Sequence, residues 1–363
     1  MSINRPAIAV GIGALLGVLA FVGRGSIADD SEPLPVATAP TTVPIATTAP
    51  STTVPVTTTT SIAVPDPPEA RESLVIHATG DVNFDPAYIP RFVSEGYGSA
   101  FDGLGGLFVD DDLTIVNLEC APSMLGLPLD KAFVFRCDTT SLPILASQGI
   151  DVVNLANNHS QDYGPTAMLD GALQARLAGL APVGVGATVD SATSPALFDV
   201  RGWRIAVLGM GGVVPSSDWL ATPDRPGMAS GDDIEQMTAA VEAASRQADL
   251  VFVSIHWGVE GESEPRPDDI ERAKRLIEAG ADAIFGHHPH RLGDVEFVDG
   301  RPVFWTLGNF IWPRLSDASA TTAVATVEIS ADGEISACLL PAFIERSGQP
   351  VLTAADHCSD LDE

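Results

Sequence analysis

The chain has 363 residues, enough for one large domain or two ordinary ones. It carries 19 basic and 48 acidic residues, a formal charge of −29, which argues against a protein that coats DNA or RNA through a basic face. A hydrophobic content of 45% and a charged content of 18% allow a sizeable core and exclude global disorder.

The N-terminus is typical of an export signal. Arg5 precedes an apolar run over residues 7–23, and Arg24 follows it. At 1.5 Å per helical residue such a run spans roughly 25 Å, which is enough for a thin bilayer. We expect residues 1–28 to be either a retained single-pass anchor or a signal peptide, cut after a small-x-small triplet that ends at Ala28.

Residues 29–70 are predicted to be a disordered linker. Pro, Thr, Ala and Val dominate from about Pro33 to Pro68, with repeated Thr-Thr-Val-Pro and Thr-Thr-Ala-Pro units. Proline fixes φ and has no amide donor, so this segment should be an extended, solvated spacer. With the apolar run before it, the linker predicts an extracytoplasmic domain that is anchored to the cell membrane, or secreted after cleavage near Ala28.

The cysteines fall into two pairs along the chain. Cys120 and Cys137 lie near each other in the sequence, as do Cys338 and Cys358. Because thiols outside the cytoplasm tend to oxidise, we expect one disulfide bridge within each pair, although four cysteines allow three connectivities.

A folded domain is predicted over residues 71–345, followed by an acidic tail over 346–363. Its short β-branched runs alternate with glycine-rich turns and helical patterns, which is the texture of an α/β domain. Most of the predicted strands are continuous apolar runs, as expected of strands that are buried on both faces. They are Leu74–Thr79, Leu113–Leu118, Asp151–Leu155, Arg204–Gly209, Leu250–Ile255, Ala283–Phe285 and Val303–Leu307.

Helical patterns lie between these strands. Pro165–Ala178 opens with proline at a first-turn position, and Asp232–Gln247 and Asp268–Ala279 both begin with acidic residues, which suit a helix N-terminus. The later segment Thr321–Cys338 alternates like an edge strand or a hairpin, with an Asp-Gly turn at 332–333.

Polar residues stand just past the C-terminal ends of separate predicted strands. Ligands bind at this edge of an α/β sheet because its loops converge there. The polar runs are Gly80-Asp81-Val82-Asn83, Asn117-Leu118-Glu119, Asn157-Asn158-His159 with Asp162, His256-Trp257-Gly258 and Gly286-His287-His288-Pro289-His290. Carboxylate, amide and imidazole groups without cysteine predict a divalent metal site suited to Mn, Fe or Zn, unlike a thiolate zinc site. In His288-x-His290, two imidazoles can face two adjacent ions, because alternate residues of an extended strand share a face.

Six motifs in order resemble the CapA family, the capsule or poly-γ-glutamate biosynthesis proteins, from about residue 74 to 315. They are Gly-Asp-Val-Asn, Asn-Leu-Glu, Asn-Leu-Ala-Asn-Asn-His-Ser-Gln-Asp-Tyr-Gly, His-Trp-Gly-x-Glu, Gly-His-His-Pro-His and Leu-Gly-Asn-Phe-Ile. The resemblance implies the calcineurin-like metallophosphoesterase fold, a β-sandwich flanked by helices (α/β/β/α), as a single domain behind the anchor and the linker. It also implies a role in capsule or poly-γ-glutamate biosynthesis, with an anionic polymer or a phosphoester as substrate and capsule-synthesis membrane proteins as partners.

Carried over residue by residue, the resemblance implies a site for two divalent ions. The ligands of the first ion would be Asp81, His290 and a bridging Glu119. Those of the second would be Asn158, His256 and His288. His159 would be the acid that protonates a leaving oxygen, with Asp162 as its orienting partner.

Some positions depart from the family pattern or have two interpretations. Asn83 is a candidate ligand where many metallophosphoesterases have the histidine of Asp-x-His, and an amide oxygen ligates more weakly than imidazole. Gly261 follows Glu260, where the family usually has an aromatic residue. Trp257 either lines the cleft or, as we prefer, belongs to the core, and Asn309 either reaches the site or caps its own turn.

Two functions fit these observations. The first is a metal-dependent hydrolase of a phosphoester, or of another ester or amide, outside the membrane. The second is a non-catalytic accessory protein that binds, exports or anchors an anionic polymer. The charge of −29 would repel such a polymer unless the metals and Arg136 or Arg291 reverse the field locally.

The remaining histidines are not expected to bind metal. His287 is expected to support the ligands, and His77 and His357 are expected to be structural or solvated.

Overall fold

The computed structural model describes residues 70–353. The chain divides into two units, residues 1–64 and 65–363, and every described residue belongs to the second unit. The predicted export segment, nearly all of the predicted linker, and the tail with His357 and Cys358 lie outside the described residues. Between residues 70 and 353, no helix combines the length and the apolar character that crossing a bilayer requires.

The larger sheet has eight strands in the order β16-β15-β14-β1-β2-β3-β4, and β13 also pairs with β1. β1 to β4 run parallel to one another, whereas β14 to β16 are antiparallel to their neighbours. The strands are β1 (Leu74–Val82), β2 (Leu113–Leu118), β3 (Val152–Asn154), β4 (Ala181–Val183), β13 (Asn309–Ile311), β14 (Thr321–Ile329), β15 (Ile335–Ile344) and β16 (Pro350–Leu352).

The smaller sheet has six strands in the order β11-β12-β10-β9-β7-β6. Its four central strands are parallel, and antiparallel strands close both edges. The strands are β6 (Ala196–Val200), β7 (Trp203–Gly211), β9 (Leu250–His256), β10 (Ala283–His287), β11 (Val295–Val298) and β12 (Arg301–Phe304). β5 (Val185–Gly186) and β8 (Gly227–Met228) form a separate two-stranded ribbon.

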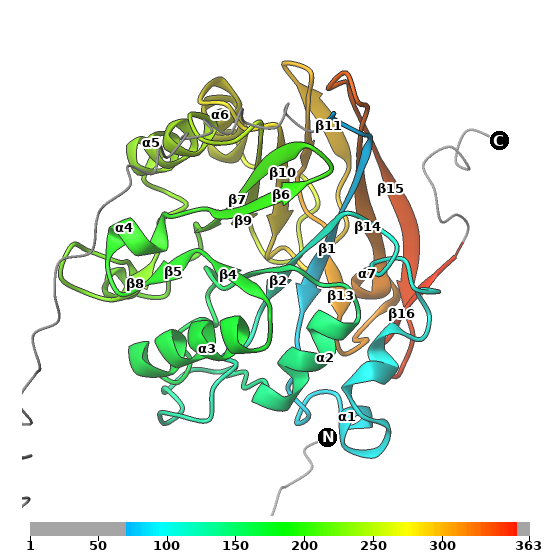
Figure 1. Cartoon of the computed structure of the whole chain (residues 1–363). Coiled ribbons are helices and arrows are strands. Elements are labelled where there is room, and N and C mark those ends of the chain that lie inside the picture. Colours follow the sequence, from blue (N-terminus) through cyan, green and yellow to red (C-terminus); the bar gives the residue numbers. More distant parts are fainter. Residues whose placement is uncertain (1–69, 354–363) are drawn as a thin grey trace, which may run out of the picture. The chain divides into compact units, whose positions relative to one another are not determined.

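Helices lie on the outer faces of both sheets, and one short helix, Val189–Ala192, packs instead against the ribbon of β5 and β8. They are α1 (Arg91–Glu95), α2 (Leu142–Ser147), α3 (Pro165–Leu177), α4 (Val189–Ala192), α5 (Ile234–Ser245), α6 (Pro267–Glu278) and α7 (Asp317–Ala320), with 3₁₀ turns at Tyr97–Phe101, Thr139–Ser141 and Ser217–Trp219. Figure 1 shows α5 and α6 side by side near the smaller sheet, while α2 and α3 lie at the larger sheet. Local chemistry starts them as predicted: Pro165 opens α3, and the Asp233 carboxylate accepts a hydrogen bond from Gln236 N at the start of α5.

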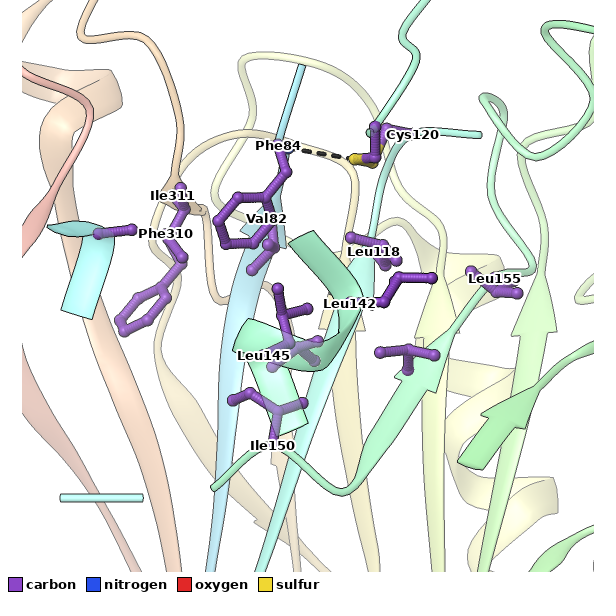
Figure 2. Packing of buried hydrophobic residues seen from close by; sticks show 14 of the residues in the cluster. Val82, Phe84, Leu118, Cys120, Leu142, Leu145, Ile150, Leu155, Phe310 and Ile311 are labelled. Carbon is purple, nitrogen blue, oxygen red and sulfur yellow. Dashed lines mark hydrogen bonds between the residues drawn. A yellow bond between two sulfur atoms is a disulfide. The ribbon is translucent and has the colours of Figure 1, made fainter. Parts of the chain in front are cut away.

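Three buried hydrophobic clusters define the layers. One lies between the sheets, where Ile76 and Ile115 of the larger sheet share a cluster with Phe252 of the smaller. The second joins the smaller sheet to α5 and α6, and the third joins the larger sheet to α1, α2 and α3. In Figure 2, Leu142 and Leu145 of α2 lie close to Val82 of β1 and Leu118 of β2. The order helix, sheet, sheet, helix confirms the predicted α/β/β/α sandwich.

All seven predicted strands form, as β1, β2, β3, β7, β9, β10 and β12, and the predicted helices form as α3, α5 and α6. The predicted hairpin also forms, because β14 pairs with β15 through a turn in which Gly333 has φ +87°. The edge strands β6, β11 and β16 were not predicted, because they are half-exposed and lack an apolar run. β16 lies past residue 345, so the sheet continues beyond the predicted end of the domain.

One predicted disulfide is present. Cys120 and Cys137 are bonded, with their Cα atoms 5.6 Å apart, and both are buried. The bridge holds the chain after β2 beside the chain after β1, since Phe84 N lies 3.2 Å from Cys137 Sγ. The predicted bridge from Cys338 to Cys358 involves a residue outside the described part of the chain and stays a prediction.

Candidate functional site

The C-terminal ends of parallel strands from both sheets meet at one buried group of polar side chains. These are Asp81 on β1, Glu119 after β2, Asn158 after β3, His256 at the end of β9, and His288 and His290 after β10. The sheets fix the roots of these segments, so residues far apart in the sequence are brought to one place.

Glu119 is shared by two groups that could each hold a metal ion. Asp81, Glu119 and His290 offer ligand atoms that all lie within 4.8 Å of one another, and so do Glu119, His256 and His288. His290 Nδ1 lies 3.0 Å from Asp81 Oδ2, and His256 Nε2 lies 3.7 Å from Glu119 Oε1. Glu119 is therefore common to both groups, one with Asp81 and His290 and the other with His256 and His288.

The two amide side chains predicted as ligands are placed differently. Asn158 Oδ1 lies 2.9 Å from His256 Nε2, so its oxygen stands beside the second group. Asn83 is buried, and its Oδ1 accepts a hydrogen bond from Asp85 N at 2.8 Å. A ligand role for Asn83 would therefore require its oxygen to serve the Asp85 amide and an ion together.

The surroundings of the Glu119 carboxylate show whether these residues fit a cation. Its side chain is fully buried, and neither of its oxygens has a hydrogen-bond partner among residues 70–353. Burial, and then the charges of Asp81 and Glu260, raises the pKa of Glu119 well above its ordinary value. A buried carboxylate without partners is costly, and binding a metal is one way in which proteins offset that cost. The donor atoms around Glu119 therefore fit divalent cations.

The protonation of the neighbouring groups agrees with this fit. Burial, followed by the nearby histidines, lowers the pKa of His256 well below its ordinary value, and burial lowers the pKa of His288 to about 4. Burial acts to raise the pKa of Asp81, but His290, His287 and Asn117 together outweigh it, and that pKa lies below its ordinary value. Neutral imidazoles and ionised carboxylates are the forms that bind borderline divalent metals.

The backbone is constrained at these positions. His288 and His290 have φ of +98° and +56°, a region that residues other than glycine seldom adopt and that often marks a functional loop. Gly80 precedes Asp81 where a Cβ atom would lie only 2.2 Å from Gly308 O. Only glycine allows this close approach, through which Asp81 N donates to Gly308 O at 2.8 Å.

Asn117 on β2 positions candidate ligands, although sequence reasoning gave it no role. Its Nδ2 donates to Asp81 Oδ1 at 2.8 Å and lies 3.2 Å from His256 Nδ1. Asn157 supports this strand end by donating to Leu118 O at 2.9 Å. Asn117 belongs to the Asn-Leu-Glu motif, so the sequence marked it as notable. The contact of Asn117 with Asp81, however, depends on the register between β1 and β2.

The two residues predicted to act in proton transfer are in contact. His159 Nδ1 lies 2.6 Å from Asp162 Oδ2, and Asp162 is fully buried. The other ring nitrogen, Nε2, lies 3.8 Å from Glu119 Oε1, so it faces the candidate metal groups. Burial lowers the pKa of His159 below its ordinary value, although Asp162 opposes the shift.

Lys131 and Phe135, from the segment between the bonded cysteines, hold this pair. Lys131 Nζ donates to Asp162 Oδ1 and to Asn158 O, both at 2.6 Å. Phe135 N donates to Asp162 Oδ2 at 2.8 Å, and the Phe135 ring stacks on His159 with 4.1 Å between centroids. Sequence reasoning missed both residues. The only available signal was that Lys131 is one of two lysines in the chain.

A cavity of about 280 Å³ opens beside these groups. Its lining combines polar groups of the candidate site with aromatic and aliphatic side chains. The lining residues are Asn83, Tyr88, Phe133, Phe135, His159, Glu260, His290, Trp312, Pro313 and Leu315. The Trp312 ring lies 4.7 Å from that of His290. No sequence motif predicted these apolar walls.

The two further described histidines lie outside both metal groups. His287 Nε2 lies 2.9 Å from Ser254 Oγ, which agrees with the expected supporting place behind the ligands. His77 lies on β1 with its Nδ1 2.7 Å from Asp111 Oδ2, and both side chains are buried, which agrees with the expected structural role.

Trp257 and Asn309, which had two interpretations each, are both buried. The Trp257 indole donates to Trp305 O at 3.0 Å within the cluster beneath α5 and α6, so the preferred core placement is confirmed. Asn309 Nδ2 donates to Ser319 O at 3.0 Å and so ties β13 to α7.

The two arginines expected near the site differ in their contacts. Arg291 Nη1 donates to His290 O at 2.8 Å, directly beside a candidate ligand. The guanidinium of Arg136 stacks on the Tyr163 ring at 3.6 Å and donates to Leu125 O at 2.8 Å. Arg136 therefore braces the segment between the bonded cysteines.

Among solved structures, the fold is similar to a putative 5′-nucleotidase from Staphylococcus aureus, with a TM-score of 0.45 and 13% identity over 80% of this chain and 57% of that one. It is also similar to a 5′-nucleotidase from Candida albicans, with a TM-score of 0.43 and 14% identity over 75% of this chain and 52% of that one.

Relatives in sequence come from bacteria. The capsule biosynthesis protein CapA of Bacillus anthracis is 31% identical over 62% of this chain and 56% of its own length. The PGA biosynthesis protein CapA of Bacillus subtilis is 33% identical over 52% of this chain and 51% of its own length. A probable polyglutamine synthesis accessory protein of Mycobacterium tuberculosis is 32% identical over 55% of each chain. The chain thus spans about half the length of these relatives.

The family comparison covers most of the described domain. Residues 75–314, more than half of the chain, match the family described as bacterial capsule synthesis protein PGA_cap. The match contains every candidate ligand and the His159–Asp162 pair. The chain therefore belongs to the PGA_cap family of bacterial capsule synthesis proteins.

Proposed function

We propose that this domain is a metal-dependent phosphoesterase that acts in the synthesis of a capsule or poly-γ-glutamate polymer. The observation that carries the proposal is Glu119, a buried carboxylate without hydrogen-bond partners among residues 70–353, which lies between two groups of ligand atoms. The first ion would be held by Asp81, Glu119 and His290, and the second by Glu119, Asn158, His256 and His288.

Phosphoester hydrolysis needs charge neutralisation, a nucleophile and an acid. When bound, two divalent ions would supply Lewis-acid charge and lower the pKa of water. His159 would supply the acid, because its Nε2 faces the metal groups. The water oxygen joins phosphorus and releases one proton to solvent as the bond from phosphorus to the leaving oxygen breaks. The proton on His159 Nε2 passes to that leaving oxygen, and His159 then regains a proton from solvent. The net change is the addition of one water across the ester bond.

The surrounding residues would hold His159 in the required orientation. Asp162 Oδ2 would accept a hydrogen bond from the Nδ1–H of His159, 2.6 Å away, so Nε2 is directed toward the substrate. Lys131 and the Phe135 amide occupy the two oxygens of Asp162. Fixed donors of this kind keep a catalytic group in place without a reorganisation cost during the reaction.

We place this activity outside the cytoplasm. The apolar run over residues 7–23 and the Pro/Thr-rich linker support attachment to the outer side of the membrane, or secretion after cleavage near Ala28. The disulfide between Cys120 and Cys137 supports the same location, since such bonds persist in oxidising compartments.

A second function has its own support. Relatives bear the names of capsule and PGA biosynthesis proteins, and one is named a synthesis accessory protein. The domain would then bind, export or anchor an anionic polymer, or act with membrane proteins of capsule synthesis, and its metals would serve binding alone.

Metal analysis and hydrolysis together test the proposal. The purified full chain should contain divalent metal by mass spectrometry and should hydrolyse bis(p-nitrophenyl) phosphate with added Mn²⁺. The variant His288→Ala should lose at least one equivalent of metal and most of the activity. The control His77→Gln, which removes a histidine outside both groups, should keep both. A wild-type protein without metal or hydrolysis would contradict the proposal.

His159 separates the two functions. With an alkyl phosphoester, whose leaving oxygen needs a proton, the variant His159→Ala should keep its metal but lose hydrolysis by about a hundredfold or more if the imidazole is the general acid. If the domain only binds polymer, the same variant should restore the cell-surface polymer of a deletion strain as well as wild type does.

A further inference from the structure

The segment between Cys120 and Cys137 presents apolar side chains to solvent beside the candidate active site. Leu127 is 82% exposed and Phe133 is 61% exposed, and Met124, Leu125 and Leu129 are also exposed. Residues 121–129 (Ala-Pro-Ser-Met-Leu-Gly-Leu-Pro-Leu) contain no charged residue, in a chain with a net charge of −29. Surface loops are usually polar, and a gathered apolar patch on a soluble domain marks a binding surface.

This segment is held firmly, so its exposed side chains are not the result of a loose loop. The disulfide closes its ends, and Leu129 N donates to Asp162 O at 2.8 Å. Gly126 has φ +74° and packs so closely on Tyr163 that a Cβ atom would lie 1.9 Å from the Tyr163 carbonyl oxygen. Backbone groups of the segment, such as Leu129 N, form hydrogen bonds within the domain, whereas the side chains of its leucines are exposed to solvent.

The apolar patch continues into the cavity of the candidate active site. Phe133 lines that cavity together with His159 and His290. Leu315, which is 80% exposed, and Trp312 line it from the chain after β13. Phe133 therefore links the exposed apolar segment to the cavity that holds His159 and His290.

We propose that the substrate is an amphiphilic phosphoester, the phosphate of a long-chain apolar alcohol presented by a membrane. This inference rests on the proposed function and specifies its substrate class. The phosphoester would lie at the metal groups, and the first carbons of the chain would lie between Phe133 and Leu315. A cavity of about 280 Å³ holds only the head group and a few carbons, so the rest of the chain would extend over Leu125 and Leu127.

The sequence before the domain supports a membrane as the source of this ligand. The apolar run over residues 7–23 is predicted to enter a bilayer, and residues 24–69 would tether the domain to it. As the extended spacer that its Pro and Thr content predicts, a segment of that length reaches up to roughly 140 Å, so a domain tethered to one membrane can bring its cavity to the surface of that membrane. A free soluble phosphoester such as a sugar phosphate would leave the exposed leucines without a partner.

Substrate chain length tests the proposal. Methyl, butyl and octyl esters of p-nitrophenyl phosphate, kept below their micelle concentrations, share the reacting group and differ only in the apolar chain. With the full chain and Mn²⁺, kcat/KM should rise at least tenfold from methyl to octyl. Each buried methylene contributes up to about fourfold, which corresponds to about 0.8 kcal/mol. Equal kcat/KM values across the series would overturn the proposal.

Two double variants locate the effect. Leu125→Ser with Leu127→Ser should reduce the octyl-to-methyl ratio to about threefold or less. The control pair Leu197→Ser and Phe297→Ser removes exposed apolar side chains from β6 and β11 and should keep the wild-type ratio. If both double variants reduce the octyl-to-methyl ratio equally, or if neither reduces it, this segment does not bind the alkyl chain of the substrate.

A binding measurement separates this inference from the proposed function. Octylphosphonate and methylphosphonate cannot be hydrolysed, and calorimetry with the full chain should show tighter binding of octylphosphonate by tenfold or more. If no ester is hydrolysed but this preference persists, the phosphoesterase activity fails and the amphiphile site stands. If esters are hydrolysed and the two phosphonates bind equally, the activity stands and the amphiphile site fails.

Light scattering tests whether the apolar patch joins two copies of the chain. If the leucine variants dissociate an oligomer and the chain-length ratio is unchanged, the patch joins two copies and the proposal is wrong.

Discussion

The two ends of the parallel strands use carboxylates in opposite ways. At the N-terminal ends, aspartates that directly precede a strand accept hydrogen bonds of 2.8 to 2.9 Å from the backbone of the neighbouring strand. These are Asp112 before β2, Asp151 before β3, Asp249 before β9 and Asp282 before β10. At the C-terminal end of β2, Glu119 is buried, and neither of its oxygens has a partner among the described residues.

The difference shows that residue type and position beside a strand do not identify a ligand. Asp112 and Glu119 flank the same strand, yet Asp112 completes the hydrogen bonding of Val75 N, whereas Glu119 leaves its acceptors open beside imidazoles. A histidine beside an aspartate is equally ambiguous. The pair of His77 and Asp111 is as close as that of His159 and Asp162, but it lies outside both metal groups. Unsatisfied buried acceptors distinguish the two ends.

The largest expected effect comes from Glu119→Gln. It should reduce kcat/KM by about a hundredfold or more and remove bound metal, because it neutralises the carboxylate shared by both groups. In EDTA the variant should be at least as stable as wild type, because burial already raises the pKa of Glu119 and so disfavours its charged form, and the neutral amide has the same shape. Mass spectrometry and urea unfolding measure the two results.

The matched change at the other end of β2 is Asp112→Asn. It removes the same charge but keeps an acceptor for Val75 N, so its metal content and activity should equal those of wild type. A Glu119→Gln protein that still holds two ions would break the comparison between the two ends.

The next effect concerns the contact of Lys131 with Asp162. Lys131→Met leaves one oxygen of Asp162 without its donor, so His159 is less well oriented. Hydrolysis of an alkyl ester with a poor leaving group should fall by about ten- to a hundredfold, since general-acid catalysis is worth about that much or more. A p-nitrophenyl ester should lose much less, because its leaving oxygen hardly needs a proton. Kinetics with both esters measure the difference.

Lys131→Arg serves as the conservative control and should recover part of the alkyl ester activity, because a guanidinium can still donate to Asp162. Equal losses for both esters would assign Lys131 a purely structural role and leave the proton-transfer pair unsupported.

The sequence predicted the layers and strand ends well for a physical reason. Strands buried on both faces, such as Leu250–Ile255, are mostly apolar runs, and the candidate ligands Asp81 and His290 lie at or just after the C-terminal ends of such strands. The edge strand β6 escaped prediction because its partly exposed side chains do not form such a run. The split of the ligands into two groups came from the family resemblance and agrees with the geometry.

Other parts of the site depend on contacts between segments distant in the sequence. Lys131 acts on Asp162 across 31 positions, and no local pattern reports such a contact. Asn117 reaches Asp81 only through the register of β1 on β2. The apolar cavity walls join Phe133 to Leu315, and neither residue belongs to a motif.

A smaller effect is expected from Asp282→Ala at the N-terminal end of β10. This change removes the acceptor of Val251 N, which lies 2.8 Å from Asp282 Oδ2, and the partner of Arg301 at 3.3 Å. The free energy of unfolding in EDTA should fall by about 1–2 kcal/mol, as expected for a buried amide left without its partner. Metal content should stay at the wild-type value. Asp282→Asn keeps an acceptor and should cost less, so equal losses in the two variants would argue against the backbone hydrogen bond as the cause.

The smallest effect is a pH dependence at Asp151. Burial, and then the charge of Asp111, raises the pKa of Asp151 to about 6, although the hydrogen bond from Thr114 N opposes this shift. The folded state therefore holds this proton more tightly than the unfolded state. The resulting stabilisation is complete below the unfolded pKa of about 4 and is lost as the pH rises through about 6.

Asp151→Asn should consequently become more favourable, relative to wild type, as the pH rises from 4 to 7. The full pKa shift corresponds to about 3 kcal/mol, and solvent screening of this half-buried group reduces the expected change to about 1 kcal/mol. Urea unfolding in EDTA at both pH values measures it. Asp110→Asn removes the same charge from an exposed position in the loop before β2 and should show a smaller change. If the two variants have the same pH dependence, the net charge governs the effect and the burial of Asp151 does not. The N-terminal ends would then hold no buried carboxyl with a raised pKa to compare with Glu119.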